Sequence, residues 1–147
     1  MLVSEYAPGP YGFVKGALGT LEAMPEVGQH AVAVISVHAS PLSELGSGEN
    51  GGMNRAIRRL CEGLSLQGVP TDVFVRRDGP GPAEELIAPL SRLVRLPVGP
   101  PKPIRKEAVR ELLDDFAAAA IDHAASERRS YRAIHGHYWH AGVVSRQ

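Results

Sequence analysis

The side chains best suited to bind a polar ligand gather in one short loop. The loop carries an imidazole at His38, a carboxylate at Glu49 and amides at Asn50 and Asn54, with the glycine pair Gly51-Gly52 near its end. Two adjacent glycines let a bulky ligand approach the backbone closely. We expect a helix to begin near this pair, and the unpaired N–H groups and partial positive charge of a helix N-terminus attract anions. The loop therefore predicts a site for a phosphate or a similar anion.

The glycine pair does not identify the ligand by itself. It is not part of a phosphate loop of the form GxxxxGK[ST], because no Lys-Ser or Lys-Thr follows the glycines. A serine hydrolase is also disfavoured, because the pattern GxSxG is missing. The local pattern leaves two interpretations open: an anion-binding turn, or a strand-to-helix loop in which the glycines serve only the turn.

A second polar segment lies near the end of the chain and holds three histidines. An imidazole can donate or accept a hydrogen bond near neutral pH, so His137 suits a ligand hydroxyl, although it could instead satisfy backbone groups at a strand end. We expect His135 to point the other way along its strand and to pack, and Tyr138 and Trp139 to shape the site. The HxH spacing occurs in metal sites, but no carboxylate lies in the segment, so we expect no metal.

Apolar runs and helical periods predict how the first segment is positioned. Residues 31–35 are continuously apolar, as in a central parallel strand covered on both faces. Ile57, Leu60, Cys61 and Leu64 recur on one face of a helix. The expected elements are a strand at 31–37, the polar loop at 38–52, a helix at 53–67 ended by Gly68, and a strand at 71–75.

The rest of the chain continues the alternation of strands and helices. The expected elements are a loop at 78–82, a short strand at 93–96, a long helix at 105–127 and a strand at 133–135. This order predicts an α/β fold, a Rossmann-like parallel sheet with flanking helices. Such sheets bind ligands beyond the carboxyl ends of their strands, where both polar segments fall. We expect Arg76 and Arg77 to be solvated charges at a strand end.

Both polar segments resemble stretches of one enzyme family. SVHASPL followed by GENGGMN, between Ser36 and Asn54, and IHGHYW, from Ile134 to Trp139, look like the amino-terminal domain of the retaining glycosyltransferases of family 4, which have the GT-B fold. The two stretches occur in the family's order and at about its spacing. The resemblance extends over about residues 31–142. It points to two groups, the mycothiol inositol-phosphate glycosyltransferases and the sucrose-phosphate synthases.

The resemblance implies a reaction and the residues that serve it. A sugar would pass from a nucleotide-sugar donor to a sugar-phosphate or polyol-phosphate acceptor with retention, and no cofactor is expected besides the donor as co-substrate. Such an enzyme must stabilise the departing diphosphate and hold the acceptor hydroxyl beside the sugar. By this resemblance His137 is the catalytic residue, placed against the transferred sugar. The implied substrate-binding residues are His38, Glu49, Asn50, Gly51, Gly52, Met53 and Asn54.

Composition and charge argue against several other classes of protein. Sixteen basic and sixteen acidic residues cancel, so no broad basic surface calls for nucleic acid. The single cysteine, Cys61, excludes an internal disulfide and falls on the apolar face of the first helix, where packing is its expected role. No apolar run approaches the roughly 20 residues that span a bilayer, and the first residues do not form a secretory signal. We therefore expect a cytoplasmic chain.

Length sets the main limit on the expected activity. Residues 1–30 carry scattered glycine and proline and predict a loose leader, and residues 31–147 predict a partial acceptor-side domain, an incomplete amino-terminal half of the GT-B fold. The family binds the nucleotide mainly with a carboxyl-terminal domain, which has no counterpart here. We expect the chain to be inactive alone or to need a partner that supplies that domain. The alternative is a non-catalytic Rossmann-like module that binds an anion or a partner protein.

Overall fold

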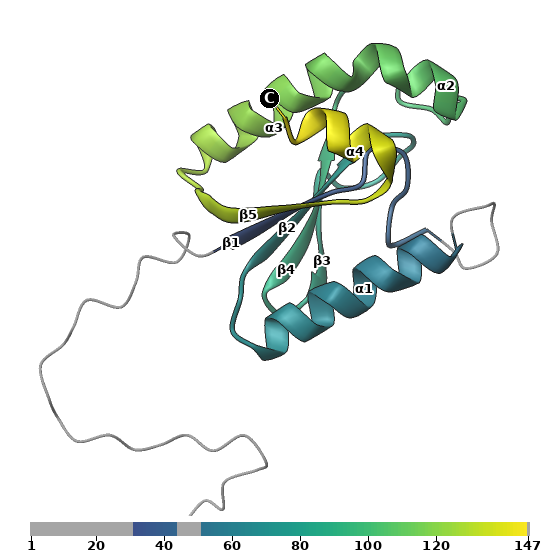
Figure 1. Ribbon diagram of the computed structural model, residues 1–147. Helices are drawn as coiled ribbons and strands as arrows, with labels where there is room; N and C mark the ends of the chain where they lie inside the picture. The colour runs from purple at the N-terminus through teal and green to yellow at the C-terminus, as the bar shows by residue number, and fades with distance from the viewer. Residues whose placement is uncertain (1–30, 44–50, 147) are drawn as a thin grey trace, which may run out of the picture.

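Five strands form one sheet between two layers of helices in the computed structural model, which describes residues 31–43 and 51–146 (Figure 1). The strands are β1 (Ala31–Ile35), β2 (Thr71–Arg76), β3 (Glu84–Ala88), β4 (Ser91–Leu96) and β5 (Tyr131–Gly136). They lie in the order β3-β4-β2-β1-β5. All neighbours are parallel except β3, which pairs antiparallel with β4. The predicted leader at 1–30 and two candidate residues, Glu49 and Asn50, lie outside the described residues.

Helices cover both faces of the sheet. α1 (Gly51–Leu66) lies on one face, and α3 (Leu113–Ser126) and α4 (Tyr138–Val144) lie on the other (Figure 1). α2 (Lys106–Val109) leads into α3 through a 3-10 turn at Arg110–Leu112, so the long helix predicted at 105–127 is interrupted. The helix predicted at 53–67 is confirmed, beginning at Gly51. No helix of the described ranges is long and apolar enough to cross a membrane.

The two covered faces explain why β1 is apolar at every position. All five of its residues are buried. One cluster packs against α1 and contains Val32, Val34, Ile57 and Cys61, and the other lies under α3 and contains Ala33, Ile35 and Phe116. Burial of an aliphatic side chain of this size contributes about 1.5–3 kcal/mol. Since β1 is held from both sides, the point at which the polar loop leaves it is fixed.

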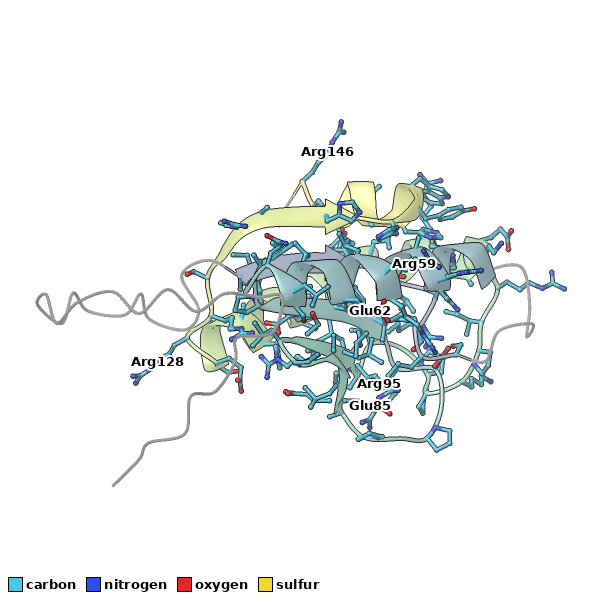
Figure 2. All side chains as sticks on the ribbon, turned by 90° about the horizontal axis from the view of Figure 1, so that it is seen from below. Arg59, Glu62, Glu85, Arg95, Arg128 and Arg146 are labelled. Atoms are coloured by element: carbon cyan, nitrogen blue, oxygen red, sulfur yellow. The ribbon has the colours of Figure 1, made fainter. Side chains whose placement is uncertain are left out.

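β3 is one of two elements that the sequence did not predict, and the other is α4. The residues of β3 are exposed or half-buried, and two acidic residues precede a short apolar run, so no strand period is evident. The strand forms one edge of the sheet, where charged side chains discourage pairing with another chain. Figure 2 shows Glu85 beside Arg95 of β4, and Oε2 of the first lies 2.8 Å from Nη2 of the second. The predicted parallel sheet therefore has one antiparallel edge.

A network of charged side chains links the amino ends of β2, β4 and β5. The carboxylate of Asp72 is fully buried and accepts hydrogen bonds from Nε of Arg92 at 2.8 Å, Nε of Arg129 at 2.8 Å and the hydroxyl of Tyr131 at 2.6 Å. Burial alone would raise the pKa of Asp72, but the hydrogen bonds from Arg129, Arg92 and Tyr131 hold it below its usual value. One anion thus joins three strands, and its role is structural.

Candidate functional site

The two polar segments leave the same end of the sheet. His38 follows β1, and His137 follows β5, which pairs with β1. The backbone N–H of His137 donates to the carbonyl oxygen of Ile35 at 2.9 Å, so the two segments run side by side where the strands end. The start of α1 lies at this end as well (Figure 1). The prediction that both segments fall beyond the carboxyl ends of parallel strands is confirmed.

His38 lies against aromatic rings of α4. Its Nδ1 atom is 3.4 Å from Nδ1 of His140, and its ring centroid is 4.8 Å from that of Tyr138. Burial lowers the pKa of His38 to about 4, and the charges of His140 and Lys106 act in the same direction, so the imidazole is neutral at pH 7. Nε2 of His38 is buried and has no hydrogen-bond partner among the described residues, which leaves this atom for a ligand hydroxyl.

A cation and a strained aromatic residue border His38. The ammonium of Lys106 lies 6.0 Å from the centre of the Tyr138 ring, at the limit of a cation–π contact. Tyr138 has a φ of 71°, in the left-handed region that residues other than glycine rarely adopt. Strain of this kind clusters at functional sites, where the surrounding structure maintains it. Because Tyr138 is 48% exposed, its ring is accessible to a ligand.

The ring of His137 packs against His135, with 4.6 Å between the ring centroids. The expectation that these two side chains point in opposite directions is wrong, because side chains two residues apart on a strand project from the same face. Burial, followed by the charge of His135, lowers the pKa of His137, and its Nε2 atom is buried without a partner in the described ranges. Within residues 31–43 and 51–146, no group of three or more histidine, cysteine or acidic side chains could hold a metal ion.

The start of α1 offers an accessible backbone and one buried amide. A Cβ atom added at Gly51 or Gly52 would meet no atom of the described residues within 4 Å, which leaves room for a ligand beside the start of the helix. Asn54 is buried, and its Oδ1 atom has no hydrogen-bond partner in the part of the chain that the structure describes. Met53 packs against the apolar cluster under α1, so its side chain anchors the helix.

Arg76 is buried and is not the solvated charge that we expected. Its guanidinium donates to the carbonyl oxygens of Pro100 and Lys102, at 2.7 Å in each case. These bonds tie β2 to the proline-rich loop before α2 and so restrain the segment that carries Lys106. A hollow of about 60 Å³ lies beside Arg76, and His38 and Asp78 also line it.

The structure divides the predicted site residues into three groups. His38 lies with Tyr138 and His140, His137 lies with His135, and Gly51, Gly52, Met53 and Asn54 form the start of α1. Sequence reasoning missed Lys106, Arg76 and His140. Lys106 lies in a stretch that matches no motif. Nothing in the sequence around Arg76 distinguishes it from an ordinary charged residue at the end of a strand. The one signal for His140 was a polar residue where the family resemblance leads us to expect a small or apolar one.

Several glycosyltransferases are similar to this chain. The family model of the glycosyl transferase 4-like domain matches residues 51–147. The D-inositol 3-phosphate glycosyltransferase of Corynebacterium kroppenstedtii is 37% identical over 129 residues, which make up 86% of this chain and 28% of that protein. The protein of the same name from an Arthrobacter species is 37% identical over 116 residues, 77% of this chain and 27% of that protein.

The fold comparison agrees with these sequence matches. The sucrose-phosphate synthase of Thermosynechococcus elongatus superposes with a TM-score of 0.75 at 34% identity, over 81% of this chain and 30% of that one. The chain thus spans less than a third of the length of each of these three relatives. Its predicted α/β fold and the resemblance found in its two polar segments are both confirmed. The chain belongs to the glycosyl transferase 4-like family.

Proposed function

We propose that this chain is the acceptor-side domain of a glycosyltransferase that moves a sugar from a nucleotide-sugar donor to a phosphorylated polyol or sugar, with retention at the transferred carbon. The observation that carries the proposal is a set of buried polar atoms at one end of the sheet that have no partner among the described residues: Nε2 of His38, Nε2 of His137 and Oδ1 of Asn54. Buried polar groups are nearly always hydrogen-bonded, so these atoms suit a ligand rich in hydroxyls. Relatives named for D-inositol 3-phosphate and sucrose phosphate support a phosphorylated acceptor.

Two positive features at this end of the sheet could attract phosphate groups. One is the ammonium of Lys106, which lies 6.0 Å from the ring of Tyr138 and acts on the charge of His38. The other is the N-terminus of α1, a helix of 16 residues whose dipole favours an anion. We assign the acceptor phosphate to Lys106, because this cation is close to His38, and the departing diphosphate of the donor to the N–H groups of Gly51 and Gly52.

The neutral imidazoles serve the hydroxyl groups. His38 would orient the acceptor through Nε2, and His137 would hydrogen-bond a hydroxyl of the transferred sugar near the reacting carbon. Asn54 would accept from the acceptor or the donor through its buried Oδ1. The roles of Glu49 and Asn50 remain predictions from the family resemblance. Transfer itself is expected only together with a second domain that binds the nucleotide.

The proposal is tested by calorimetric titration of the chain with D-inositol 3-phosphate, glucose 6-phosphate and inorganic phosphate. Binding of at least one organic phosphate should weaken about tenfold in His38→Ala and in Asn54→Ala, the size expected for one lost hydrogen bond to a polar ligand. Arg59→Ala, an exposed position on α1, is the matched control and should bind like the unaltered chain (Figure 2). Indifference to both organic phosphates would instead favour the non-catalytic anion- or partner-binding module.

A further inference from the structure

We infer that His140 is a positioning residue that holds the imidazole of His38 in one orientation and one tautomer for the acceptor. This inference rests on the proposed function and assigns a role to a residue that carries no motif. The two residues are 102 positions apart in the sequence, yet their Nδ1 atoms lie 3.4 Å from one another. The contact joins the end of β1 to α4 and lies directly behind the atom of His38 that we assign to the acceptor.

The packing around His140 leaves its ring in one orientation. His140 is completely buried, the centroid of the Trp139 ring lies 3.9 Å from its own, and the ring of Tyr138 lies 5.2 Å away. The ring of His38 meets it nearly edge-on, at an interplanar angle of 71°. An imidazole confined in this way presents its Nδ1 atom at a fixed point, so it can orient a neighbour that bonds to it.

The hydrogen bond also fixes where the protons lie. Each neutral imidazole carries one N–H, so an Nδ1-to-Nδ1 hydrogen bond requires one ring to donate and the other to accept. Whichever role Nδ1 of His38 takes, its Nε2 atom has the opposite one. The tautomer of His38 is thus tied to that of His140, and the hydrogen bond of the His140 ring with the backbone of Lys106 favours one of the two arrangements. Without His140, the His38 ring would exchange between both tautomers and bind the acceptor with only one of them.

Burial keeps both rings neutral near pH 7. Burial lowers the pKa of His140, and the backbone of Lys106 and the carboxylate of Glu107 oppose this shift without reversing it. His38 faces Tyr138 and His140 from α4 and the charge of Lys106 from α2. Arg76 and Asp78, at the end of β2, line the hollow beside it. A pair of neutral rings is the state in which the shared hydrogen bond links the tautomer of His38 to that of His140.

The inference is tested by NMR, which reports the protonation of each ring nitrogen directly. Long-range proton–nitrogen NMR spectra of the unaltered chain at neutral pH should show one protonated and one bare nitrogen for His38. His140→Leu, which keeps the buried volume but removes the hydrogen bond, should give averaged His38 signals. His140→Asn, whose amide lies close to the place of Nδ1, should restore a single tautomer. His123→Leu is the matched control, because this half-buried histidine lies at the other end of the sheet, near Glu84.

Binding supplies the second measurement. D-inositol 3-phosphate should bind three- to tenfold more weakly to His140→Leu, and His140→Asn should recover most of this loss. Averaged His38 signals in the unaltered chain, or a single tautomer and unchanged binding in His140→Leu, would overturn the inference. If the unaltered chain binds no sugar phosphate, the proposed function fails, but the nitrogen signals still decide whether His140 controls His38. If the leucine variant does not fold, the signals of the unaltered chain and of His140→Asn decide the same question.

Discussion

The main polar clusters at the two ends of the parallel strands differ in how their buried atoms are paired. At the amino end, the fully buried Asp72 receives hydrogen bonds from two arginines and a tyrosine. At the carboxyl end, His38, His137 and Asn54 bury atoms that have no partner in the described parts of the chain. Paired polar groups stabilise the fold, whereas unpaired ones keep hydrogen-bonding capacity at a cost in stability. One end of this sheet therefore maintains the structure, whereas the other has the unpaired groups on which the proposed ligand site rests.

The largest loss of stability is expected when the ion pairs of Asp72 at the amino end are removed. Asp72→Asn leaves Arg92 and Arg129 without their buried counter-charge, and removal of one partner from a buried ion pair typically costs about 3–5 kcal/mol. The side chains of Arg92 and Arg129 keep 20% and 16% of their surface exposed, so water relieves part of the cost. We expect a loss near the lower limit, about 3 kcal/mol, in the free energy of unfolding measured with urea.

The control for this variant is an exposed carboxyl group on α1. Glu62→Gln changes a side chain at the surface that has no part in the Asp72 network. Its unfolding free energy should stay within about 0.5 kcal/mol of that of the unaltered chain. A loss below about 1 kcal/mol in Asp72→Asn would contradict a structural role for the amino end.

As the pH falls, the stability that each end of the sheet contributes should be lost over a different pH range. The pKa of His38 falls from 6.5 to about 4 on folding, so the unfolded chain binds a proton in this interval that the folded chain does not. Stability contributed by the neutral ring is therefore present above pH 6.5 and is lost as pH falls towards about 4. The folded pKa of Asp72 lies below 3.8, so its contribution is lost only under more acidic conditions.

His38→Gln tests this separation. The variant should lose less unfolding free energy between pH 6.5 and about 4 than the unaltered chain, because glutamine does not titrate. Below pH 3.8 both proteins should lose stability alike, since Asp72 is intact in both. Urea unfolding at closely spaced pH values gives both slopes. Parallel curves over the whole range would mean that the His38 ring is not desolvated by folding.

The sequence predicted the elements that local patterns encode. The apolar run of β1 and the helical period of Ile57 and Cys61 are properties of neighbouring residues, and they placed the strand, the helix and the polar loop between them. The edge strand β3 was not predicted, because its residues are exposed or half-buried and their sequence shows no alternation of apolar and polar residues. A pattern shows that a residue faces the core, but it does not show which distant residue it meets there.

The missed contacts are therefore those between distant segments. Arg129 reaches Asp72 across 57 positions, and His140 reaches His38 across 102. The buried guanidinium of Arg76 is similar, because its acceptors are carbonyl oxygens of a loop that lies more than 20 positions further along the chain. Each of these pairs forms only after the sheet brings its strands together. The motifs located the candidate site, and the fold supplied the partners of its residues.

A smaller effect is expected in the loop that leads to Lys106. Gly99 has a φ of 65°, and a Cβ atom there would lie 2.6 Å from Cδ1 of Leu112. Gly99→Ala should lower the unfolding free energy by about 1–2 kcal/mol, the usual cost of a left-handed residue with a side chain. It should also weaken binding of D-inositol 3-phosphate, because Lys106 follows this loop. Gly79→Ala is the control: its Cβ atom meets nothing within 4 Å, and both properties should be unchanged.

The smallest effect should come from an ion pair that resembles the Asp72 network in composition but not in burial. Glu85 and Arg95 join β3 to β4 at 2.8 Å, and the Glu85 side chain is 44% exposed (Figure 2). Because water solvates a broken pair at this position, Glu85→Gln should cost less than about 1 kcal/mol, measured by urea unfolding at low and high salt. If this variant lost as much stability as Asp72→Asn, burial would not be what distinguishes the two ion pairs. The amino end would then owe its stability to charge alone, and the contrast with the histidine-rich end would rest on the number of ion pairs rather than on whether buried groups are paired.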